Sequence, residues 1–241
     1  MSIDALAALV RERQPCVVLT GAGISTESGI PDFRSATGIW SEVDPFEVAS
    51  LHAFHADPER VWRFYATRAQ SLLEAKPNRG HDALAELERR ELVHAVITQN
   101  IDSLHHRAGS REVVEVHGSI RTAVCLGCGA SEGLEAVLAQ LDERSAPVCS
   151  VCDSILKPGV VLFGELLPVQ AIARATELAR AAELVLVVGS SLEVWPVAGL
   201  PLEAPALAIV NRGPTALDAH AVLSIDGDSG PTLASLLTAL E

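Results

Sequence analysis

The sequence has few basic residues and no long apolar run. Lys and Arg total 18 against 31 Asp and Glu, which gives a formal net charge of −13. Such a surface repels nucleic acid, so we expect no nucleic-acid partner and favour a basic one, such as a lysine-bearing protein segment. No apolar run approaches the roughly 20 residues of a membrane span, so we expect no membrane association.

The N-terminal segment also lacks the signals of export. Residues 1–15 carry an acid early and have neither a basic n-region nor a cleavage site. We therefore expect a cytoplasmic protein, and in that compartment cysteines serve metal or thiol chemistry rather than a disulfide framework. The hydrophobic content of 49% is ample for the core of one large domain, or of a large and a small one.

Short apolar runs alternate with helical segments along most of the chain. The runs predict strands at 15–19, 93–98, 113–116, 159–163, 184–188, 205–210 and 221–225. Amphipathic or capped segments predict helices at 3–13, 57–76, 80–90, 168–182 and 231–240. Continuous apolar strands between helices are typical of a parallel sheet that is covered on both faces. We therefore predict an α/β fold, with a doubly wound parallel sheet into which residues 121–157 are inserted.

The inserted segment carries four of the five cysteines, around a helical stretch at 133–144. They form two Cys-x2-Cys pairs separated by 20 residues: Cys125, Cys128, Cys149 and Cys152. Each pair can straddle a tight turn, so the two turns can present four thiolates to Zn²⁺ in a tetrahedral arrangement. Four thiolates leave no open coordination position, which predicts a structural metal. A nucleic-acid-binding zinc ribbon is the competing use, but the segment has no basic cluster. Cys16 lies within the first apolar run and is expected to be a buried bystander.

A glycine-containing turn follows the first predicted strand. Gly21 and Gly23 allow backbone N–H groups to approach a phosphate without an intervening side chain. The dinucleotide fingerprint G-x-G-x-x-G would need a glycine where Thr26 stands, so the turn alone is a weak signal of nucleotide binding. Further along, Asp32, Phe33 and Arg34 are either a functional loop or, more simply, a core phenylalanine between two surface charges.

Polar or small residues also follow several other predicted strands. The segments are TQNIDSLH at 98–105, His117-Gly118, Gly189-Ser190-Ser191 and VNRG at 210–213. Doubly wound sheets bind ligands at the carboxyl ends of their strands, and several such exits suggest a ligand of nucleotide size. The first segment is also explained by an Asx turn that caps the next helix. The periodicity of the sequence does not show which of His105, His106 and His117 would act as a general base.

In this order and spacing, the motifs resemble those of the sirtuins, the NAD-dependent protein lysine deacylases. The resemblance covers nearly the whole chain. It rests on GAGIS at 21–25, SGIPDFR at 28–34, TQNID at 98–102, His117-Gly118, both cysteine pairs, VVLFGE at 160–165, GSSLEV at 189–194 and Val210-Asn211.

The resemblance implies a single catalytic unit with NAD as co-substrate, in two parts. A Rossmann-like large domain would comprise residues 1–35, 78–120 and 157–241. A smaller domain would combine a helical insert at 36–77 with the zinc module at 121–156. We expect the unit to act as a monomer on acyl-lysine proteins and peptides.

Roles for individual residues are implied in the same way. The loop at 21–40 would fold over NAD as cradle and lid in one segment, and the 98–102 segment would line the nicotinamide and ribose. The exits after 188 and 210 would face the diphosphate and adenosine. The implied cofactor-binding residues are Gly21, Ala22, Gly23, Ser25, Asp32, Phe33, Arg34, Trp40, Gln99, Asn100, Ile101, Asp102, Gly189, Ser190, Ser191, Asn211, Arg212, Gly213 and Ser229.

By resemblance, the substrate peptide would pair as a strand with the segments around 161–165 and 191–194. The first of these supplies Val161, Phe163, Gly164 and Glu165 as substrate residues. In sirtuins the acyl oxygen attacks C1′ of the ribose and expels nicotinamide. The implied catalytic residues are His117, Asn100 and Asp102, with His117 as the base for a ribose hydroxyl. The products would be nicotinamide, free lysine and 2′-O-acyl-ADP-ribose.

Tyr65 and Arg68 bear on which acyl group is removed. They are three residues apart on a predicted helix and therefore share a face, where a phenol and a guanidinium can bind a carboxylate. A surface arginine beside a core aromatic residue is the simpler interpretation. The segment VWRFYATR nevertheless resembles the Tyr-x-x-Arg motif of class III sirtuins, which remove succinyl, malonyl and glutaryl groups. Ala36 and Thr37 also suit a roomy acyl pocket.

The sequence thus predicts a desuccinylase and demalonylase with weaker deacetylation. Alternatives are an enzyme that is mainly a deacetylase, one that transfers ADP-ribose or hydrolyses NAD, and a non-enzymatic NAD-binding module. One departure from the family pattern is Lys157 before the VVLFGE segment, where an arginine is expected.

Overall fold

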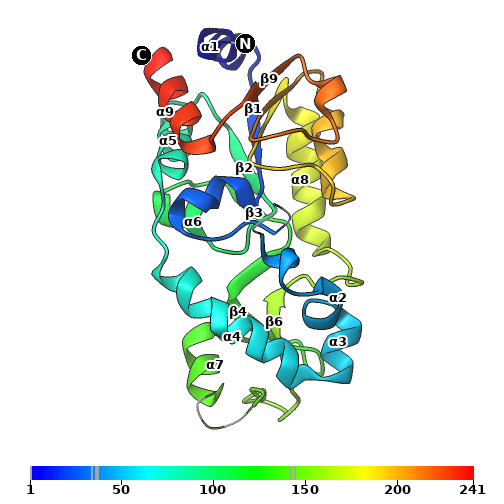
Figure 1. The fold of residues 1–241 in the computed structure, drawn as a ribbon. Coiled ribbons are helices and arrows are strands. Elements are labelled where there is room, and N and C mark those ends of the chain that lie inside the picture. The colour runs from blue at the N-terminus through cyan, green and yellow to red at the C-terminus, as the bar shows by residue number, and fades with distance from the viewer. Residues whose placement is uncertain (1, 34, 36–37, 142, 144) are drawn as a thin grey trace.

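A six-stranded parallel sheet forms one half of the molecule, the upper half in Figure 1. The computed structural model describes residues 2–33, 35, 38–141, 143 and 145–241. The strand order is β3-β2-β1-β7-β8-β9, so the chain winds outward from β1 in one direction and from β7 in the other. The strands are β1 (Cys16–Thr20), β2 (Ala95–Thr98), β3 (Val113–Glu115), β7 (Leu184–Val188), β8 (Leu207–Asn211) and β9 (Leu223–Asp226). The predicted doubly wound sheet is confirmed, and its switch point lies between β1 and β7.

Helices cover both faces of this sheet, which explains the continuous apolar strands. In β1, Cys16 and Val18 point to one face and pack with α1 (Ile3–Glu12), α5 (Arg79–Arg89) and α9 (Ser229–Ala239). Val17 and Leu19 point to the other face and pack with α8 (Val169–Ala181) and the 3-10 helix η3 (Val197–Glu203). Every residue of β1 and β7 is buried.

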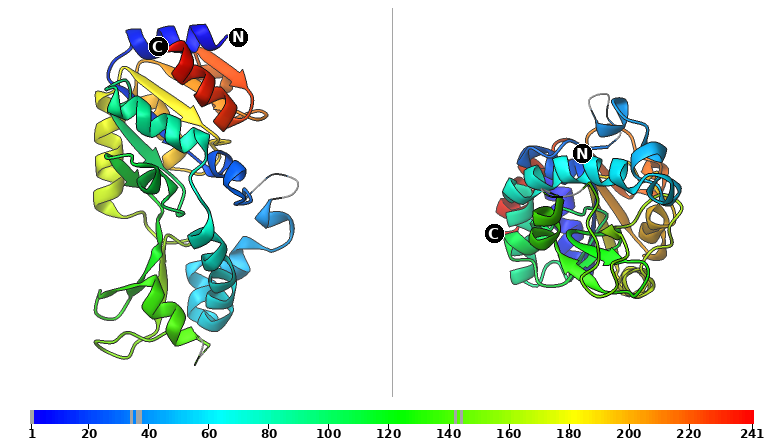
Figure 2. Two further views of the ribbon diagram at one scale, coloured as in Figure 1. Left: turned by 90° about the vertical axis from the view of Figure 1, so that its left-hand side faces the viewer. Right: turned by 90° about the horizontal axis from the view of Figure 1, so that it is seen from below.

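The other half of the molecule is built around a three-stranded antiparallel sheet, as the views in Figures 1 and 2 show. Its order is β5-β4-β6, from β4 (Gly118–Cys125), β5 (Ser131–Gly133) and β6 (Leu156–Val160). A third apolar core joins this sheet to the helices α2 (Pro45–Val48), α3 (Leu51–Ala56), α4 (Pro58–Glu74) and α7 (Leu134–Leu141). The N-cap of α4 is Asp57, whose Oδ1 accepts from Arg60 N at 3.0 Å.

Several boundaries differ from the sequence-based expectation. The strand predicted at 159–163 is β6, which ends at Val160. Beyond it, Phe163 N donates to Ala49 O at 2.8 Å and Phe163 O accepts from Leu51 N at 2.9 Å, so this segment is held by a helical connection instead of the sheet. The predicted helix at 133–144 is α7, over Leu134–Leu141. The small sheet itself was not predicted, because β4 contains several polar residues and β5 has only three residues.

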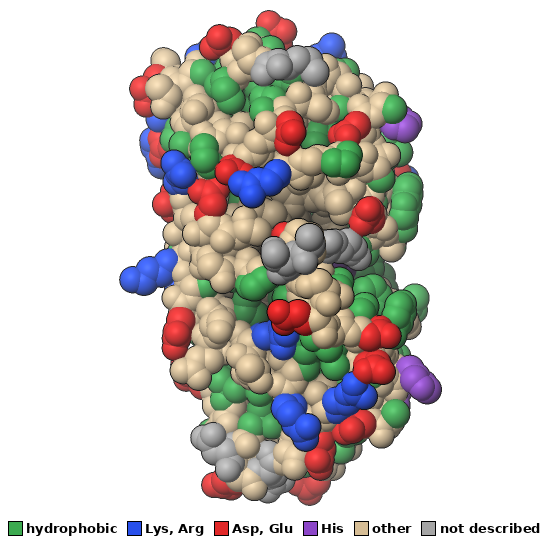
Figure 3. Space-filling view, viewed as in Figure 1, with side chains coloured by type: hydrophobic (Ala, Val, Ile, Leu, Met, Phe, Trp, Pro, Cys, Tyr) green, Lys and Arg blue, Asp and Glu red, His purple; other side chains and the backbone are tan. Residues whose placement is uncertain are grey.

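The remaining connections contain short helices. They are η1 (Ala22–Ser28), η2 (Ile39–Ser41), α6 (Leu104–Ala108) and η4 (Asp218–His220), of which all but η2 follow a strand. None of the helices in the described part of the chain is both long and apolar enough to cross a membrane. On the face drawn in Figure 3, acidic and basic side chains are interspersed.

Candidate active site

The turn after β1 lies directly on the turn after β7. Gly21 N donates to Val188 O at 3.1 Å, and Gly23 N donates to Gly189 O at 2.9 Å. A Cβ on Gly23 would lie 2.8 Å from Gly189 Cα, and one on Gly189 would lie 2.4 Å from Ile24 N. Gly189 also has φ +62°, in the region that favours glycine. These glycines are therefore required for two backbones to meet at the switch point, with Ala22 beside them at the start of η1.

A buried polar cluster lies beside this turn. Ser25 Oγ donates to Asp102 Oδ2 at 2.7 Å, and Asn100 Nδ2 lies 3.1 Å from both Ser25 Oγ and Gly21 O. Burial raises the pKa of Asp102, although hydrogen bonds from Leu104 N and Ser25 oppose the shift. The structure thus brings together three residues that the sequence placed on two separate loops.

His117 enters the same region from the end of β3. Its Nδ1 lies 3.1 Å from Gln99 O, and because a carbonyl oxygen can only accept, Nδ1 must carry the proton. The lone pair of the neutral ring is then on Nε2, as a general base requires. Gln99 Nε2 in turn donates to Ser190 Oγ at 2.9 Å, which connects the exits of β2 and β7. Ile101 accepts from Ile120 N and connects the cluster to β4.

The structure shows how His105, His106 and His117 differ in burial, which the sequence pattern could not show. His105 is 1% exposed, and its Nε2 lies 2.9 Å from Thr20 Oγ1, whereas His106 is exposed and His117 is partly exposed. Burial lowers the pKa of His105 well below its ordinary value. His105 is therefore a neutral core histidine.

Sequence reasoning missed His81. It lies on α5, fully buried, with its ring 4.9 Å from that of His105 and its Nε2 3.5 Å from Ser25 Oγ. Burial lowers the pKa of His81 to about 4. The only local signal was its place in a capping box with Asn78, which indicates a helix start and not a site.

The segment after η1 is held by its own turns and by aromatic stacking. Asp32 Oδ1 accepts from Ser35 N at 2.8 Å, and Trp40 N donates to Phe33 O at 3.0 Å. The rings of Phe33 and Trp40 stack with centroids 5.2 Å apart. Three residues to which sequence reasoning gave roles lie outside the described residues: Arg34, Ala36 and Thr37.

The exits of β8 and β9 lie further along the same sheet edge. Asn211 Nδ2 donates to Arg212 O and Gly213 O, each at 3.1 Å, and Gly213 N donates to Asp226 Oδ1 at 2.9 Å. Arg212 forms an ion pair with Asp228. Ser229, which is 5% exposed, begins α9, and Ser191 O accepts from Ala216 N. These residues are thus arranged by local turns at the carboxyl edge of the sheet.

The segment after β6 passes next to His117. Val161 N donates to His117 O at 2.8 Å, and Glu165 Oε2 accepts from Leu162 N at 2.9 Å. Gly164 has φ +84°, which permits the turn. Glu165 also pairs with Lys157, 5% exposed, whose Nζ lies 3.1 Å from Oε2 and donates to Pro158 O and Val160 O. Lys157 is thus fully hydrogen-bonded, and it supports this segment where an arginine was expected.

Tyr65 and Arg68 share one face of α4, as predicted. Tyr65 is 8% exposed, and burial raises its pKa. The Arg68 guanidinium carbon lies 3.8 Å from the centroid of the Phe64 ring, and Nη1 donates to Phe64 O at 3.1 Å. Partial burial lowers the pKa of Arg68, while Glu42 and Tyr65 oppose the shift. No carboxylate of the residues that the structure describes lies within ion-pair distance of this guanidinium.

The four paired cysteines converge on one point. Their sulfur atoms all lie within 4.8 Å of one another, with Cys125 Sγ 3.5 Å from Cys152 Sγ and Cys128 Sγ 3.6 Å from Cys149 Sγ. Tetrahedral zinc with bonds of about 2.3 Å separates its sulfur ligands by about 3.8 Å. The donor set and spacing fit Zn²⁺. Cys16 lies in β1, away from this cluster, and burial raises its pKa to about 12.

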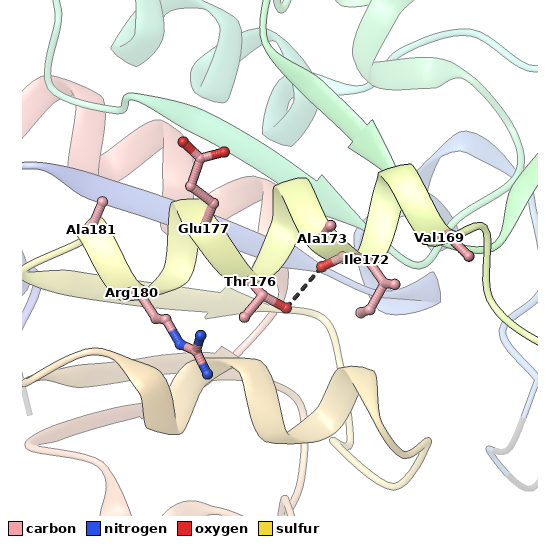
Figure 4. Close-up of a pocket in the computed structure, with 7 residues that line it drawn as sticks. All are labelled: Val169, Ile172, Ala173, Thr176, Glu177, Arg180 and Ala181. Carbon is pink, nitrogen blue, oxygen red and sulfur yellow. Dashed lines mark hydrogen bonds between the residues drawn. The ribbon is translucent and has the colours of Figure 1, made fainter.

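A surface hollow along α8 is separate from these residues. Figure 4 shows the side chains that line it, all from α8, with Thr176 Oγ1 donating to Ile172 O at 2.8 Å. It contains none of the predicted site residues. The candidate site is therefore the edge of the large sheet and the segments beside it.

Comparison with known proteins agrees with this geometry. The family model described as "Sir2 family" matches residues 21–196. An NAD-dependent protein deacetylase of Sulfurisphaera tokodaii is 45% identical over 222 residues, which cover 90% of this chain and 88% of that protein. NAD-dependent protein deacylase 2 of Pyrobaculum aerophilum is 44% identical over 236 residues, which cover 96% of this chain and 93% of the relative.

Solved structures give the same result. A Sir2 complex with a deacetylated p53 peptide and 3′-O-acetyl-ADP-ribose is 40% identical, with a TM-score of 0.94 over 99% of this chain and 98% of that one. A complex of Sir2 with a p53 peptide and NAD⁺ is 39% identical, with a TM-score of 0.90 over 99% and 98%. This chain belongs to the Sir2 family.

Proposed function

We propose that this chain is an NAD-dependent protein lysine deacylase. The proposal is supported by family membership, by relatives named as deacetylases and deacylases, and by a related structure with NAD⁺ and a peptide. The observation that carries it is the meeting of three sets of hydrogen bonds at the switch point: Gly23 to Gly189, Ser25 to Asn100 and Asp102, and His117 through Gln99 to Ser190. They meet because Gln99 precedes Asn100 and Ser190 follows Gly189 in the chain.

Each part has a role in this proposal. The N–H groups of Gly21 and Gly23 are used within the turn, so the glycines contribute by keeping the backbone free of side chains. The other N–H groups of the turn would then be able to approach the diphosphate of NAD. Asp102 and Asn100 would face the nicotinamide ribose, where a carboxylate can stabilise positive charge that develops as nicotinamide leaves. His117, with its lone pair on Nε2, removes a proton from a ribose hydroxyl, which can then attack the carbon of the transferred acyl group.

We further propose that the enzyme prefers succinyl- and malonyl-lysine to acetyl-lysine. Support comes from Arg68, which is partly buried near Tyr65 and has no carboxylate within ion-pair distance among the described residues, with Glu42 acting on it only from further away. A desolvated guanidinium gains from an anionic ligand, and the terminal carboxylate of a succinyl group can accept two parallel N–H bonds from it. A plain acetyl group has no atom to make these bonds.

The test is kcat/KM on succinyl and acetyl forms of one peptide, for the wild type and Arg68→Met. We expect the substitution to lower the succinyl value by about thirtyfold or more, which corresponds to about 2 kcal/mol, and to change the acetyl value little. Arg63→Met on the same helix, at an exposed position, is the matched control and should leave both values unchanged. A wild type that prefers acetyl-lysine, or equal losses on both substrates, would show that the enzyme is mainly a deacetylase.

A further inference from the structure

A run of stacked rings connects the segment after η1 to Arg68. Phe33 stacks on Trp40, with centroids 5.2 Å apart and planes at 29°. Trp40 stacks on Phe64, with centroids 6.0 Å apart and planes at 15°. The guanidinium of Arg68 then lies over the Phe64 ring at 3.8 Å. The arginine is thus the last member of an ordered stack.

The guanidinium uses its face and one N–H group in this arrangement. The face lies on the ring, and Nη1 donates to the carbonyl oxygen of Phe64, which is one helical turn earlier. A guanidinium has five N–H donors, all in its plane. A carboxylate binds in that plane, along an edge, so it does not compete with the ring for the face. The contact with Phe64 is therefore compatible with simultaneous binding of an anion.

Phe64 is itself held in place. Its side chain is 9% exposed, and the Tyr65 ring meets it edge-on, with centroids 5.1 Å apart and planes at 90°. Together with the stacked Trp40 ring, this contact leaves the phenyl group little freedom to turn. A long, flexible arginine side chain loses rotamer entropy when it binds a ligand, unless a rigid neighbour has already ordered it.

We propose that Phe64 is a positioning residue for recognition of acidic acyl groups. Its ring orders the Arg68 guanidinium through a cation–π contact, so that the edge of the guanidinium is ready for the acyl carboxylate. This inference rests on the acidic-acyl preference proposed above and names a second residue that the preference requires. The effect on selectivity depends on the electron density of the Phe64 ring as well as on its shape.

Fluorination of the ring separates these two properties. Replacement of Phe64 by 4-fluoro-, 3,5-difluoro- and 3,4,5-trifluorophenylalanine keeps the ring and withdraws electron density from its face in steps. We expect kcat/KM for the succinyl peptide to fall stepwise, by about threefold to thirtyfold in total, through KM for the peptide. The kcat/KM for the acetyl peptide should change by less than about twofold.

Two controls make the measurement specific. The same replacements at Phe54, a buried ring on α3, should leave the succinyl-to-acetyl ratio unchanged. In an Arg68→Met background, the replacements at Phe64 should also lose their effect on the ratio, because the cation is gone. A merely structural role for Phe64 would change both substrates together in every background.

The outcomes are distinguishable. One outcome is that Arg68→Met lowers kcat/KM for the succinyl peptide selectively while fluorination of Phe64 leaves the succinyl-to-acetyl ratio of kcat/KM unchanged. In that case the positioning role is wrong and the acidic-acyl preference stands. If Arg68→Met affects both substrates equally, the preference itself is wrong and this inference fails with it. Phe64→Met, with its melting temperature and zinc content measured, is the encoded counterpart, and it should reproduce the loss of selectivity.

Discussion

Gly23 and Gly189 touch through their backbones. The N–H of Gly23 donates to the carbonyl oxygen of Gly189, and neither residue has room for a Cβ. The contact joins the exits of the two central strands, β1 and β7, from which the sheet winds in opposite directions. This pair of turns is the part of the site that most depends on backbone shape, because any side chain would separate the two loops.

Gly23→Ala should therefore be costly. The new Cβ would lie 2.8 Å from Gly189 Cα, which is backbone and cannot turn aside. We expect a loss of about 2–4 kcal/mol in the free energy of unfolding, with weaker NAD binding, as measured by urea titration and calorimetry. Gly133→Ala, where no atom lies within 4 Å of the added Cβ, is the control and should cost less than about 0.5 kcal/mol. Equal effects at the two positions would contradict the packing argument.

His117→Ala should abolish deacylation and spare NAD binding. Loss of a general base typically lowers the rate by about 100-fold to 10,000-fold. Hydrolysis of NAD alone should suffer less, because the proposed proton transfer follows the departure of nicotinamide. Single-turnover assays that measure nicotinamide and deacylated peptide separately distinguish the two steps. His94→Ala, at an exposed position, should have no effect, and a His117→Ala enzyme with normal deacylation would remove His117 from the mechanism.

Removal of zinc should unfold the smaller half of the molecule. Cys125 and Cys149 belong to its apolar core, so loss of the metal exposes both the thiolates and their neighbours. We expect one zinc per chain by elemental analysis, and a chelator that lowers the melting temperature and activity together. Cys16→Ala should keep its zinc, since burial holds the Cys16 thiol protonated with a pKa of about 12. Full activity and stability after complete zinc loss would rule out a structural metal.

The two buried histidines should make the protein sensitive to acid. The pKa of His81 is about 4 in the folded chain and about 6.5 when unfolded, so the unfolded chain binds the extra proton between these values. Above pH 6.5 His81 therefore does not lower the free energy of unfolding. As the pH falls toward 4, this group lowers the free energy of unfolding by roughly 3 kcal/mol. His105 acts in the same direction, whereas Asp102 and Glu115 oppose it because burial raises their pKa values.

A single substitution isolates the contribution of His81. We expect His81→Gln to flatten the dependence of unfolding free energy on pH between 6.5 and 4, by up to about 1.4 kcal/mol per pH unit. Urea titrations at pH 7, 6 and 5 measure this slope. The exposed His94→Gln should leave the slope as in the wild type. If His81→Gln also leaves the slope unchanged, the pKa of His81 is not lowered by its burial.

Much of the large sheet could be predicted from local pattern. Strands buried on both faces are continuously apolar, and β1 and β7 are such runs, so their type and parallel arrangement were visible in the sequence. The small sheet was not, because β5 is a three-residue strand of Ser, Glu and Gly whose pairing depends on β4. The end of the 159–163 run differs from the prediction for a similar reason: Phe163 bonds to Ala49 and Leu51 at the start of α3, which no local signal reveals.

The sequence by itself determined the four-cysteine cluster and the family, because cysteine spacing and short ordered motifs are local properties. The tertiary structure alone decided which polar residues act together. It buried His105 and left His117 partly exposed, and it placed His81 beside Ser25, since burial depends on elements distant in the chain. It also set the Arg68 guanidinium on Phe64, a contact made within one helix but held in place by Trp40 from another segment.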